Sequence, residues 1–334
     1  MTWTEPGAFE VAAGVYRIPL PLPQDGLRAV NVYVIDSDDG LVLIDGGWAV
    51  PAGREALVAG LAVLDAGLAD VSRFLVTHVH RDHYTQAVVL GREVGATVCL
   101  GSRERATLAV IASPDHLALA SQVDQLRRLG AQALAATIAA AGKHHRLDLD
   151  EWADPDAWLL PGDVPLAGGR VLEAVETPGH TTGHLVFHDL AAGLLFAGDH
   201  VLPSITPSIG YEPVETPDPL GDFLRSLALV RSRPDALLLP AHGQVAASVH
   251  ARVDELIAHH GTRLDEVQAA VAGTGHSAAD VAAVLVWTRR GRTFDELDAF
   301  NQMLAIFETG AHLDLLAAQG AVVRELVEQV RRYR

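Results

Sequence analysis

The chain has 334 residues, 49% of them hydrophobic, and its mean hydropathy is +0.20. This length and composition are sufficient for a globular protein with a sizeable core, and they exclude an intrinsically disordered chain. The formal net charge is −17, from 42 acidic and 25 basic residues. This balance argues against a nucleic-acid partner, because nucleic-acid binders use Lys and Arg to displace phosphate counterions.

Targeting signals and cysteine content indicate the compartment. No apolar stretch approaches the roughly 20 residues that cross a bilayer, so we expect no membrane association. The first residues lack the basic-then-apolar order of a signal peptide. The single cysteine, Cys99, excludes an internal disulfide framework and fits a reducing compartment. We therefore expect a cytoplasmic protein.

The first hundred residues alternate between strand and helix patterns. Short runs rich in β-branched and aromatic residues predict strands at 14–18, 31–35, 41–44, 73–76 and 97–100. Helices are predicted at 53–64 and 85–94, and the second ends before Gly95, which is typical of a helix C-terminus. This alternation predicts an α/β domain.

Residues 102–157 interrupt the alternation. Segment 121–141 is mostly Ala, Leu, Gln and Arg, a composition that favours a helix. We interpret 102–157 as a helical insertion that either forms a cap or wall of a pocket or simply packs on the outside. Strand patterns then return at 171–175, 185–187, 194–197 and 236–239.

The C-terminal part is mainly helical. Helices are predicted at 250–272, 277–287 and 294–307, followed by a helix at 310–316, a glycine turn and a short strand at 321–323. We therefore predict two domains, an α/β domain at 1–250 that contains the insertion and a small, mainly helical domain at 251–334. Apolar helices in the insertion and in the tail make a homodimer possible.

Residues 78–83 contain three histidines and an aspartate, and only Thr77 separates them from the strand at 73–76. Imidazole is the commonest protein metal ligand, and carboxylate is its usual partner. His78 and His80 point the same way in an extended segment, so one ion can contact both. Asp82 and His83 follow, where the chain turns, and can reach a second position. The alternative is a solvated histidine-rich loop.

Three other predicted strands also end near a residue of metal-ligand type. His180 follows 171–175, Asp199 follows 194–197, and His242 follows 236–239. Gly and Pro beside these residues indicate tight turns that expose a side chain at a fixed angle. In α/β sheets, ligands gather at the carboxyl ends of strands, so we expect the three residues to join the 78–83 cluster.

The order His-x-His-x-Asp-His, then His, Asp and His, resembles the metallo-β-lactamase superfamily of hydrolases. The resemblance covers residues 12–250 and includes a turn at 43–46, where the family carries a structural aspartate, here Asp45, and the segment 177–181. It implies a four-layer αββα sandwich with a two-metal site between its sheets.

The resemblance also implies a role for each ligand. The first metal would be held by His78, His80 and His180, the second by Asp82, His83 and His242, and Asp199 would bridge both. Asp82 and Asp199 are thereby assigned to catalysis as well. Two such ions lower the pKa of a bridging water, so that hydroxide can attack a carbonyl or phosphoryl centre. Zinc fits this imidazole-rich set best, and iron or manganese remain alternatives.

The residue type at the position of His80 distinguishes groups of proteins that share this fold. Flavodiiron oxidoreductases resemble the same pattern but carry glutamate there, so the histidine favours hydrolysis over oxygen reduction. Persulfide dioxygenases keep the histidine and use a single iron, and they remain an alternative.

Tyr84 departs from the family pattern, because many relatives place glycines shortly after the Asp-His pair. We hypothesise that its hydroxyl faces the metal pocket as a catalytic and substrate-binding group; the alternative is a tyrosine packed under the following helix. Tyr211 is a second predicted substrate contact. Residues 311–322 resemble the winged-helix-type tail of lactamase-like proteins related to an endoribonuclease and to polyketide thioesterases.

These observations predict a metal-dependent hydrolase acting on a small-molecule thioester, ester, lactone or β-lactam. The first alternative is a metal-dependent nuclease or phosphodiesterase, which the acidity of the chain disfavours. The second is a mononuclear-iron, persulfide dioxygenase-like oxidoreductase, and the third a binding module with a vestigial site. The vestigial reading is disfavoured because all seven ligand positions are filled.

Overall fold

The computed structural model describes residues 2–23, 26–113, 119–142, 147–271, 273, 275–288 and 291–334. The chain forms two compact units. The first comprises Met1–Ala112, Asp148–Pro207 and Ser226–Val253, and the second comprises Ser113–Leu147, Ser208–Arg225 and Asp254–Arg334. Most of the predicted insertion therefore groups with the C-terminal helices instead of with the sheets.

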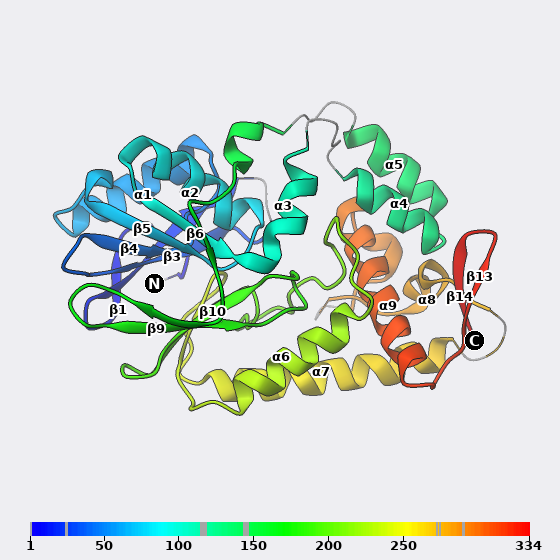
Figure 1. Cartoon of the computed structure of the whole chain (residues 1–334). Coiled ribbons are helices and arrows are strands. Elements are labelled where there is room, and N and C mark those ends of the chain that lie inside the picture. The colour runs from blue at the N-terminus through cyan, green and yellow to red at the C-terminus, as the bar shows by residue number, and fades with distance from the viewer. Residues whose placement is uncertain are drawn as a thin grey trace. The chain divides into compact units, whose positions relative to one another are not determined.

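The first unit contains a seven-stranded sheet within its described residues, with its strands in chain order (Figure 1). The strands are β1 (Phe9–Ala12), β2 (Val15–Pro21), β3 (Ala29–Ile35), β4 (Leu41–Ile44), β5 (Val71–Val76), β6 (Thr97–Gly101) and β7 (Ala157–Leu159). Pairing is antiparallel from β1 to β4 and parallel from β4 to β7. Helix α1 (Pro51–Val63) connects β4 to β5 and helix α2 (Arg81–Val94) connects β5 to β6, as parallel pairing requires.

A second sheet in this unit has the order β12-β11-β10-β9-β8. Its strands are β8 (Gly162–Pro165), β9 (Val171–Glu176), β10 (Leu185–Asp189), β11 (Leu194–Gly198) and β12 (Leu237–Pro240). Neighbours are antiparallel except β11 and β12, which are parallel. This pair brings two strand carboxyl ends to the same edge of the sheet.

The two sheets enclose one apolar core. Buried side chains from both sheets form a single cluster, in which the rings of Tyr33 and Phe196 meet edge to face at 5.4 Å. Helix α1 packs closely on the outer face of the first sheet, where a Cβ at Gly60 would lie 2.6 Å from Ile18. On the second sheet's side, Ser226 of α6 (Pro219–Arg231) donates to the Pro178 carbonyl. The predicted αββα sandwich is confirmed.

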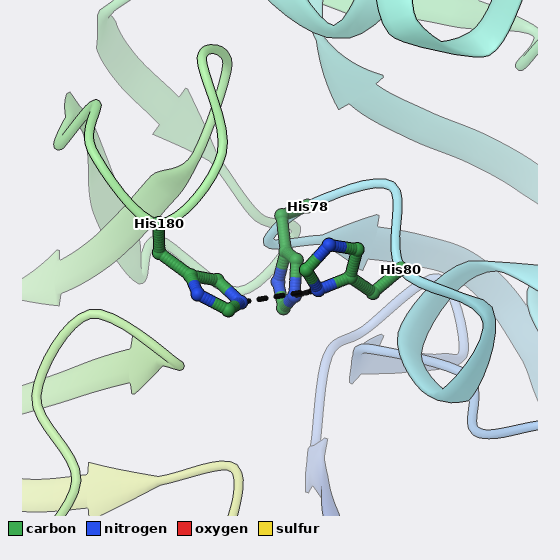
Figure 2. A group of neighbouring side chains, drawn as sticks. All are labelled: His78, His80 and His180. Atoms are coloured by element: carbon green, nitrogen blue, oxygen red, sulfur yellow. Dashed lines mark hydrogen bonds between the residues drawn. The ribbon is translucent and has the colours of Figure 1, made fainter. Parts of the chain in front are cut away.

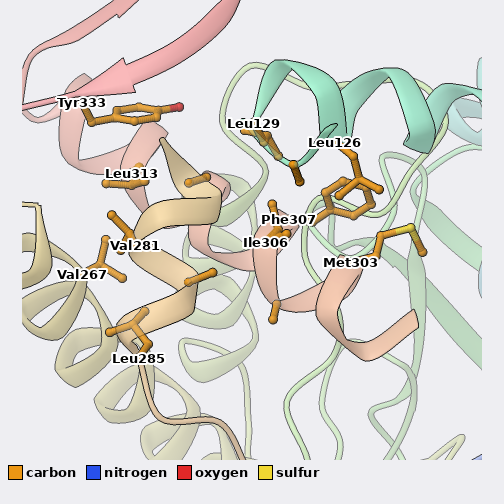
Figure 3. Close-up of a cluster of buried hydrophobic side chains, with 14 of the residues drawn as sticks. Leu126, Leu129, Val267, Val281, Leu285, Met303, Ile306, Phe307, Leu313 and Tyr333 are labelled. Atoms are coloured by element: carbon orange, nitrogen blue, oxygen red, sulfur yellow. The ribbon is translucent and has the colours of Figure 1, made fainter. Parts of the chain in front are cut away.

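The second unit is mainly helical. Its elements include α4 (Ala120–Arg128), α5 (Gln132–Gly142), most of α7 (Val249–Ala270), α8 (Ala278–Val284), α9 (Ala299–Ala318) and the hairpin β13 (Arg324–Val327) and β14 (Val330–Tyr333). Figure 3 shows the apolar cluster in which α4, α8 and α9 pack together. The winged-helix resemblance of the tail stays a prediction. No helix in the described parts of the chain is long and apolar enough to span a membrane.

Most element boundaries match the sequence predictions within a few residues, and the differences have local causes. The predicted helix at 121–141 is two helices, because the chain turns at Gly130 with φ at +89°. The predicted helices at 294–307 and 310–316 form the single helix α9, preceded by a short 3₁₀ turn (Phe294–Glu296). The prediction of a strand at 321–323 was wrong, since the hairpin begins at Arg324. The last residue of the predicted 250–272 helix lies outside the described residues.

Candidate metal centre

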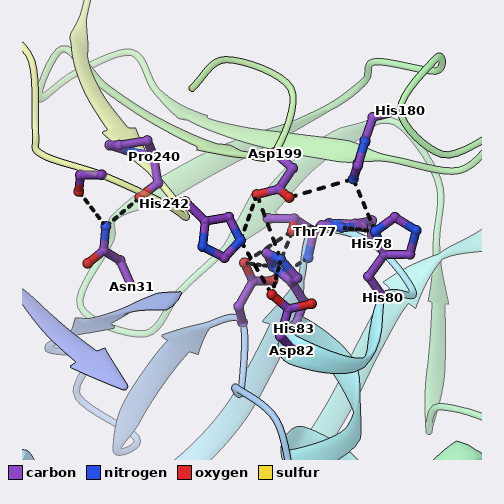
Figure 4. Close-up of polar contacts among 12 residues, drawn as sticks. Asn31, Thr77, His78, His80, Asp82, His83, His180, Asp199, Pro240 and His242 are labelled. Carbon is purple, nitrogen blue, oxygen red and sulfur yellow. Dashed lines mark hydrogen bonds and ion pairs between the residues drawn. The ribbon is translucent and has the colours of Figure 1, made fainter. Parts of the chain in front are cut away.

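Four strand ends from the two sheets deliver the predicted ligands to one place (Figure 4). His78 and His80 follow β5, and α2 begins immediately afterwards at Arg81. Asp82 and His83 are therefore in the first turn of this helix, which starts four residues earlier than predicted. The second sheet contributes the remaining three, His180 after β9, Asp199 after β11 and His242 after β12.

Three imidazoles form one half of the site. Nε2 of His78 and Nε2 of His180 each lie 3.1 Å from Nδ1 of His80 (Figure 2). Burial, together with the neighbouring His180, lowers the pKa of His80 to about 3, and burial holds the pKa of His78 well below its ordinary value. All three rings are largely buried, and neutral rings present the lone pairs that a metal ion requires.

Two carboxylates and two imidazoles form the other half. Nε2 of His242 lies 3.4 Å from Oδ2 of Asp82 and 3.4 Å from Oδ1 of Asp199. Nε2 of His83 lies 3.7 Å from the same two oxygens. Burial opposes the charged form of His83, but the carboxylates of Asp45, Asp82 and Asp199 together raise its pKa to about 9. The negative field that stabilises this proton also favours a bound cation.

Asp199 faces both halves with different oxygens. Oδ1 lies toward His83 and His242, whereas Oδ2 lies 3.6 Å from Nε2 of His180. Among the described residues, Oδ1 of Asp199 and Nε2 of His83 and His242 are buried without hydrogen-bond partners. Such groups are rare in native proteins and demand a partner. The donor set therefore fits divalent metal ions.

The family follows from comparison with known proteins. A model described as the Metallo-beta-lactamase superfamily matches residues 25–242, more than half of the chain. The chain belongs to the metallo-β-lactamase superfamily.

Members of the superfamily resemble this chain over most of its length. "Probable metallo-hydrolase YqjP" of Bacillus subtilis is 24% identical over 320 residues, which cover 92% of each chain. "Lactamase-like protein nscB" of Neosartorya fischeri is 26% identical over 72% of this chain, a match that spans only 56% of that relative. Among solved structures, metallo-beta-lactamase family protein TTHA1429 of Thermus thermophilus aligns with a TM-score of 0.77 and 29% identity, covering 97% of this chain and 99% of that one. A beta-lactamase domain protein of Burkholderia ambifaria aligns with a TM-score of 0.78 and 29% identity, covering 98% and 92% respectively.

The aspartate that this superfamily carries in the β4 turn orients two of the imidazoles. Oδ2 of Asp45 lies 2.9 Å from Nδ1 of His83, and the Thr77 hydroxyl donates to the same carboxylate. Since its proton is thus used, the Thr77 oxygen accepts from Nδ1 of His78 at 3.0 Å. Both rings then direct Nε2 to the centre, which is how metal-binding histidines are usually held. Thr77 was not predicted, although it directly precedes His78.

The His242 loop is held by β3. Nδ1 of His242 donates to the Ala29 carbonyl at 2.8 Å, so Nε2 faces the carboxylates. The Asn31 amide donates to the carbonyls of Pro240 and Gly243, both at 2.9 Å. Asn31 was also missed, and the signal was a polar residue inside a strand that is otherwise apolar and fully buried.

His184 supports Asp199 from the second sheet. Its Nε2 accepts a hydrogen bond of 3.2 Å from the Asp199 amide, and its Nδ1 lies 2.9 Å from the Thr177 hydroxyl. Because Nε2 accepts, Nδ1 carries the proton and donates to Thr177. The backbone of the residue that faces both halves of the site is thereby fixed.

The prediction that Tyr84 faces the metal pocket was wrong. Its hydroxyl donates to the Ala153 carbonyl at 2.5 Å, and the side chain is fully buried beside Trp152. Burial and two nearby aspartates raise the pKa of this phenol, so it stays protonated. Because α2 begins at Arg81, Tyr84 lies on the face of this helix that packs against Trp152. The Tyr84 hydroxyl therefore contacts the insertion, and the catalytic and substrate-binding roles of Tyr84 stay predictions.

Tyr211 belongs to the second unit. Its ring packs against Phe300 at 5.8 Å, and its carbonyl accepts a hydrogen bond from Gln122. Its predicted contact with a substrate stays a prediction.

Proposed function

We propose that the chain is a dinuclear metal-dependent hydrolase that acts on a small-molecule acyl substrate. The substrate is a thioester, ester, lactone or β-lactam, and we favour a thioester or ester over a β-lactam. The observation that carries this proposal is Asp199, whose two oxygens face two separate groups of ligand atoms. A single carboxylate placed in this way suits two ions that share a ligand.

The side chains of the site have distinct tasks in this proposal. The neutral rings of His78, His80 and His180 would hold one ion, and Asp82, His83 and His242 would hold the other. When bound, two such ions lower the pKa of a water and stabilise the developing oxyanion. Asp82 and Asp199 supply negative charge that offsets the cations. Asp45 and Thr77 keep the imidazoles oriented, so little reorganisation accompanies each turnover.

The wording of the relatives' names fits a hydrolase, since the Bacillus subtilis relative is called a metallo-hydrolase. Zinc suits the imidazole-rich set, with iron or manganese as alternatives. We further propose a cytoplasmic protein with a small-molecule substrate, no nucleic-acid partner, a winged-helix-like tail and a homodimeric assembly. These features follow from composition and sequence resemblance.

The test combines metal analysis with a substrate panel on the purified full-length chain. The panel contains acyl thioesters, esters, lactones, a nitrocefin-type β-lactam, phosphodiesters and RNA. We expect at least two zinc ions per chain and hydrolysis of a thioester or ester. One iron per chain with no zinc would overturn the dinuclear hydrolase, and cleavage of only phosphodiesters or RNA would move the protein to the nuclease class. Asp163→Ala, which removes an exposed carboxylate on β8, should keep the wild-type activity and serves as the control for variants of the site.

A further inference from the structure

A second cluster of metal-ligand side chains lies in the second unit, on helices α7 and α9. One ring nitrogen each of His259 and His260, and a carboxylate oxygen of Glu308, lie within 4.8 Å of one another. His312, one turn after Glu308 on α9, contacts His260. None of these residues belongs to the centre formed by the two sheets.

Hydrogen bonds fix the proton positions in this cluster. Nδ1 of His312 lies 2.7 Å from the backbone carbonyl of Glu308, which can only accept, so Nδ1 of His312 carries a proton. Nε2 of the neutral His312 ring is then an acceptor, and it lies 3.2 Å from Nδ1 of His260. The His260 proton therefore resides on Nδ1, which leaves a lone pair on Nε2.

That lone pair is buried and has nothing to bind. His260 is fully buried, and its Nε2 has no hydrogen-bond partner among the residues that the structure describes. Burial and the neighbouring His312 lower the pKa of His260 to about 3, so protonation does not satisfy this nitrogen at neutral pH. A histidine that donates one ring N–H to an acceptor and keeps a lone pair on its other nitrogen has the arrangement of a metal ligand.

The other two groups complete a mixed nitrogen and oxygen set. Glu308 is half-buried, and burial raises the pKa of its carboxyl group, so a cation beside it would relieve the cost of its charge. His259 is exposed and brings the cluster within reach of solvent. The nearby guanidinium of Arg263 opposes part of this rise in the pKa of Glu308, and it is also paired with Glu266 at 2.9 Å and lies over the Trp287 ring.

We propose that His259, His260 and Glu308 form a second metal site, which binds one Zn²⁺ or a similar transition-metal ion and links α7 to α9. Two imidazoles and a carboxylate suit zinc, cobalt or nickel better than calcium or magnesium. Ligand atoms of a tetrahedral zinc lie about 3.3 Å apart. The three ligand atoms here lie within 4.8 Å of one another, so binding of an ion would draw them closer together. The fourth position is left for water or another ligand.

The test counts ions on the metal-stripped, full-length chain after equilibrium dialysis against Co²⁺. Wild type is compared with His259→Ala and Glu308→Gln, and Asp265→Asn serves as a control that removes an exposed carboxylate from α7. We expect both site variants to bind one ion fewer per chain than wild type and the control. Co²⁺ should also raise the Tm of wild type more than that of His259→Ala.

Equal numbers of bound ions in wild type and His259→Ala, at matched Co²⁺, would overturn this site. His259 is exposed, so its replacement leaves the core intact and the comparison remains valid. The outcome is independent of the proposed hydrolase. If the centre between the sheets bound fewer ions than expected, all four totals would fall together and the difference between them would persist.

Discussion

Oδ2 of Asp45 lies 2.9 Å from Nδ1 of His83, and the same carboxylate accepts hydrogen bonds from the amide and the hydroxyl of Thr77. Asp45 has a φ of +65°, so the β4 turn itself aims this side chain at the start of α2. Two strand ends are thereby joined behind the imidazoles that face the candidate metal centre.

Asp45→Asn should weaken metal binding by about 10–100-fold, the usual cost of losing a partner that orients a ligand. Asparagine tolerates a positive φ, so the turn should survive the substitution. The measurement is a competition titration of Zn²⁺ against a chromophoric chelator. Asp38→Asn, an exposed carboxylate in the preceding turn, should leave the affinity unchanged. Equal affinity in wild type and Asp45→Asn would mean that Asp45 does not orient His83.

Asp199→Ala should reduce kcat by a factor of about a thousand or more, because both halves of the site lose the same ligand. The loss should persist at saturating metal, and metal analysis should find fewer ions per chain. Circular dichroism should still report the wild-type fold. Substantial activity in a folded Asp199→Ala variant would contradict its bridging role.

Tyr84→Phe should leave kcat unchanged and lower the free energy of unfolding by about 0.5–1.5 kcal/mol, because the partly buried Ala153 carbonyl loses its donor. Urea denaturation and steady-state kinetics measure the two effects separately. Tyr16→Phe, at a half-exposed position on β2, should change neither. A fall in kcat at unchanged metal content would restore the role that the sequence suggested for Tyr84.

Three of the ligands could be predicted from the sequence because each follows its own apolar strand and a turn that contains Gly or Pro. His180, Asp199 and His242 satisfy this rule, and the structure brings them to the cluster at 78–83. What a local pattern could not supply was the partner of each side chain. The Tyr84 hydroxyl binds a carbonyl in the insertion, and its environment depends on how that distant segment packs.

The same limit applies to the helical unit. Composition predicted one helix over 121–141, but the chain turns at Gly130, where a Cβ would collide with Ser277 from a remote segment. His259 and His260 had no ligand context in the sequence, since Glu308 and His312 approach them only through the packing of α9 on α7. Contacts between distant segments are fixed by the tertiary fold, and sequence spacing does not encode them.

The stability of the first unit should fall in acid through His188. This ring is buried and accepts a hydrogen bond from Arg233 at 3.1 Å, and burial together with this guanidinium lowers its pKa. The unfolded chain therefore binds a proton below about pH 6.5 that the folded chain refuses, and stability is lost as pH falls through that value. The slope for one such group is at most about 1.4 kcal/mol per pH unit.

His188→Gln should reduce this acid sensitivity, because glutamine can accept from Arg233 and does not titrate. Urea denaturation at pH 7.5 and 5.5 measures the difference. His276→Gln, at a partly exposed position in the second unit, is the matched control. An identical pH dependence in wild type and His188→Gln would exclude His188 as the source.

The candidate ligands come from both sheets of the sandwich, with His78 after β5 and His180, Asp199 and His242 on the opposite sheet. Ions held by such a set would bind ligands from both sheets at once. Metal affinity and the stability of the packing between the two sheets are therefore linked thermodynamically. A core substitution far from any ligand, such as one at Phe196 or Tyr33, would then weaken metal binding by loosening the sandwich. Conversely, the concentration of available metal in the cell would set how strongly a substitution can weaken the packing between the two sheets before the protein unfolds.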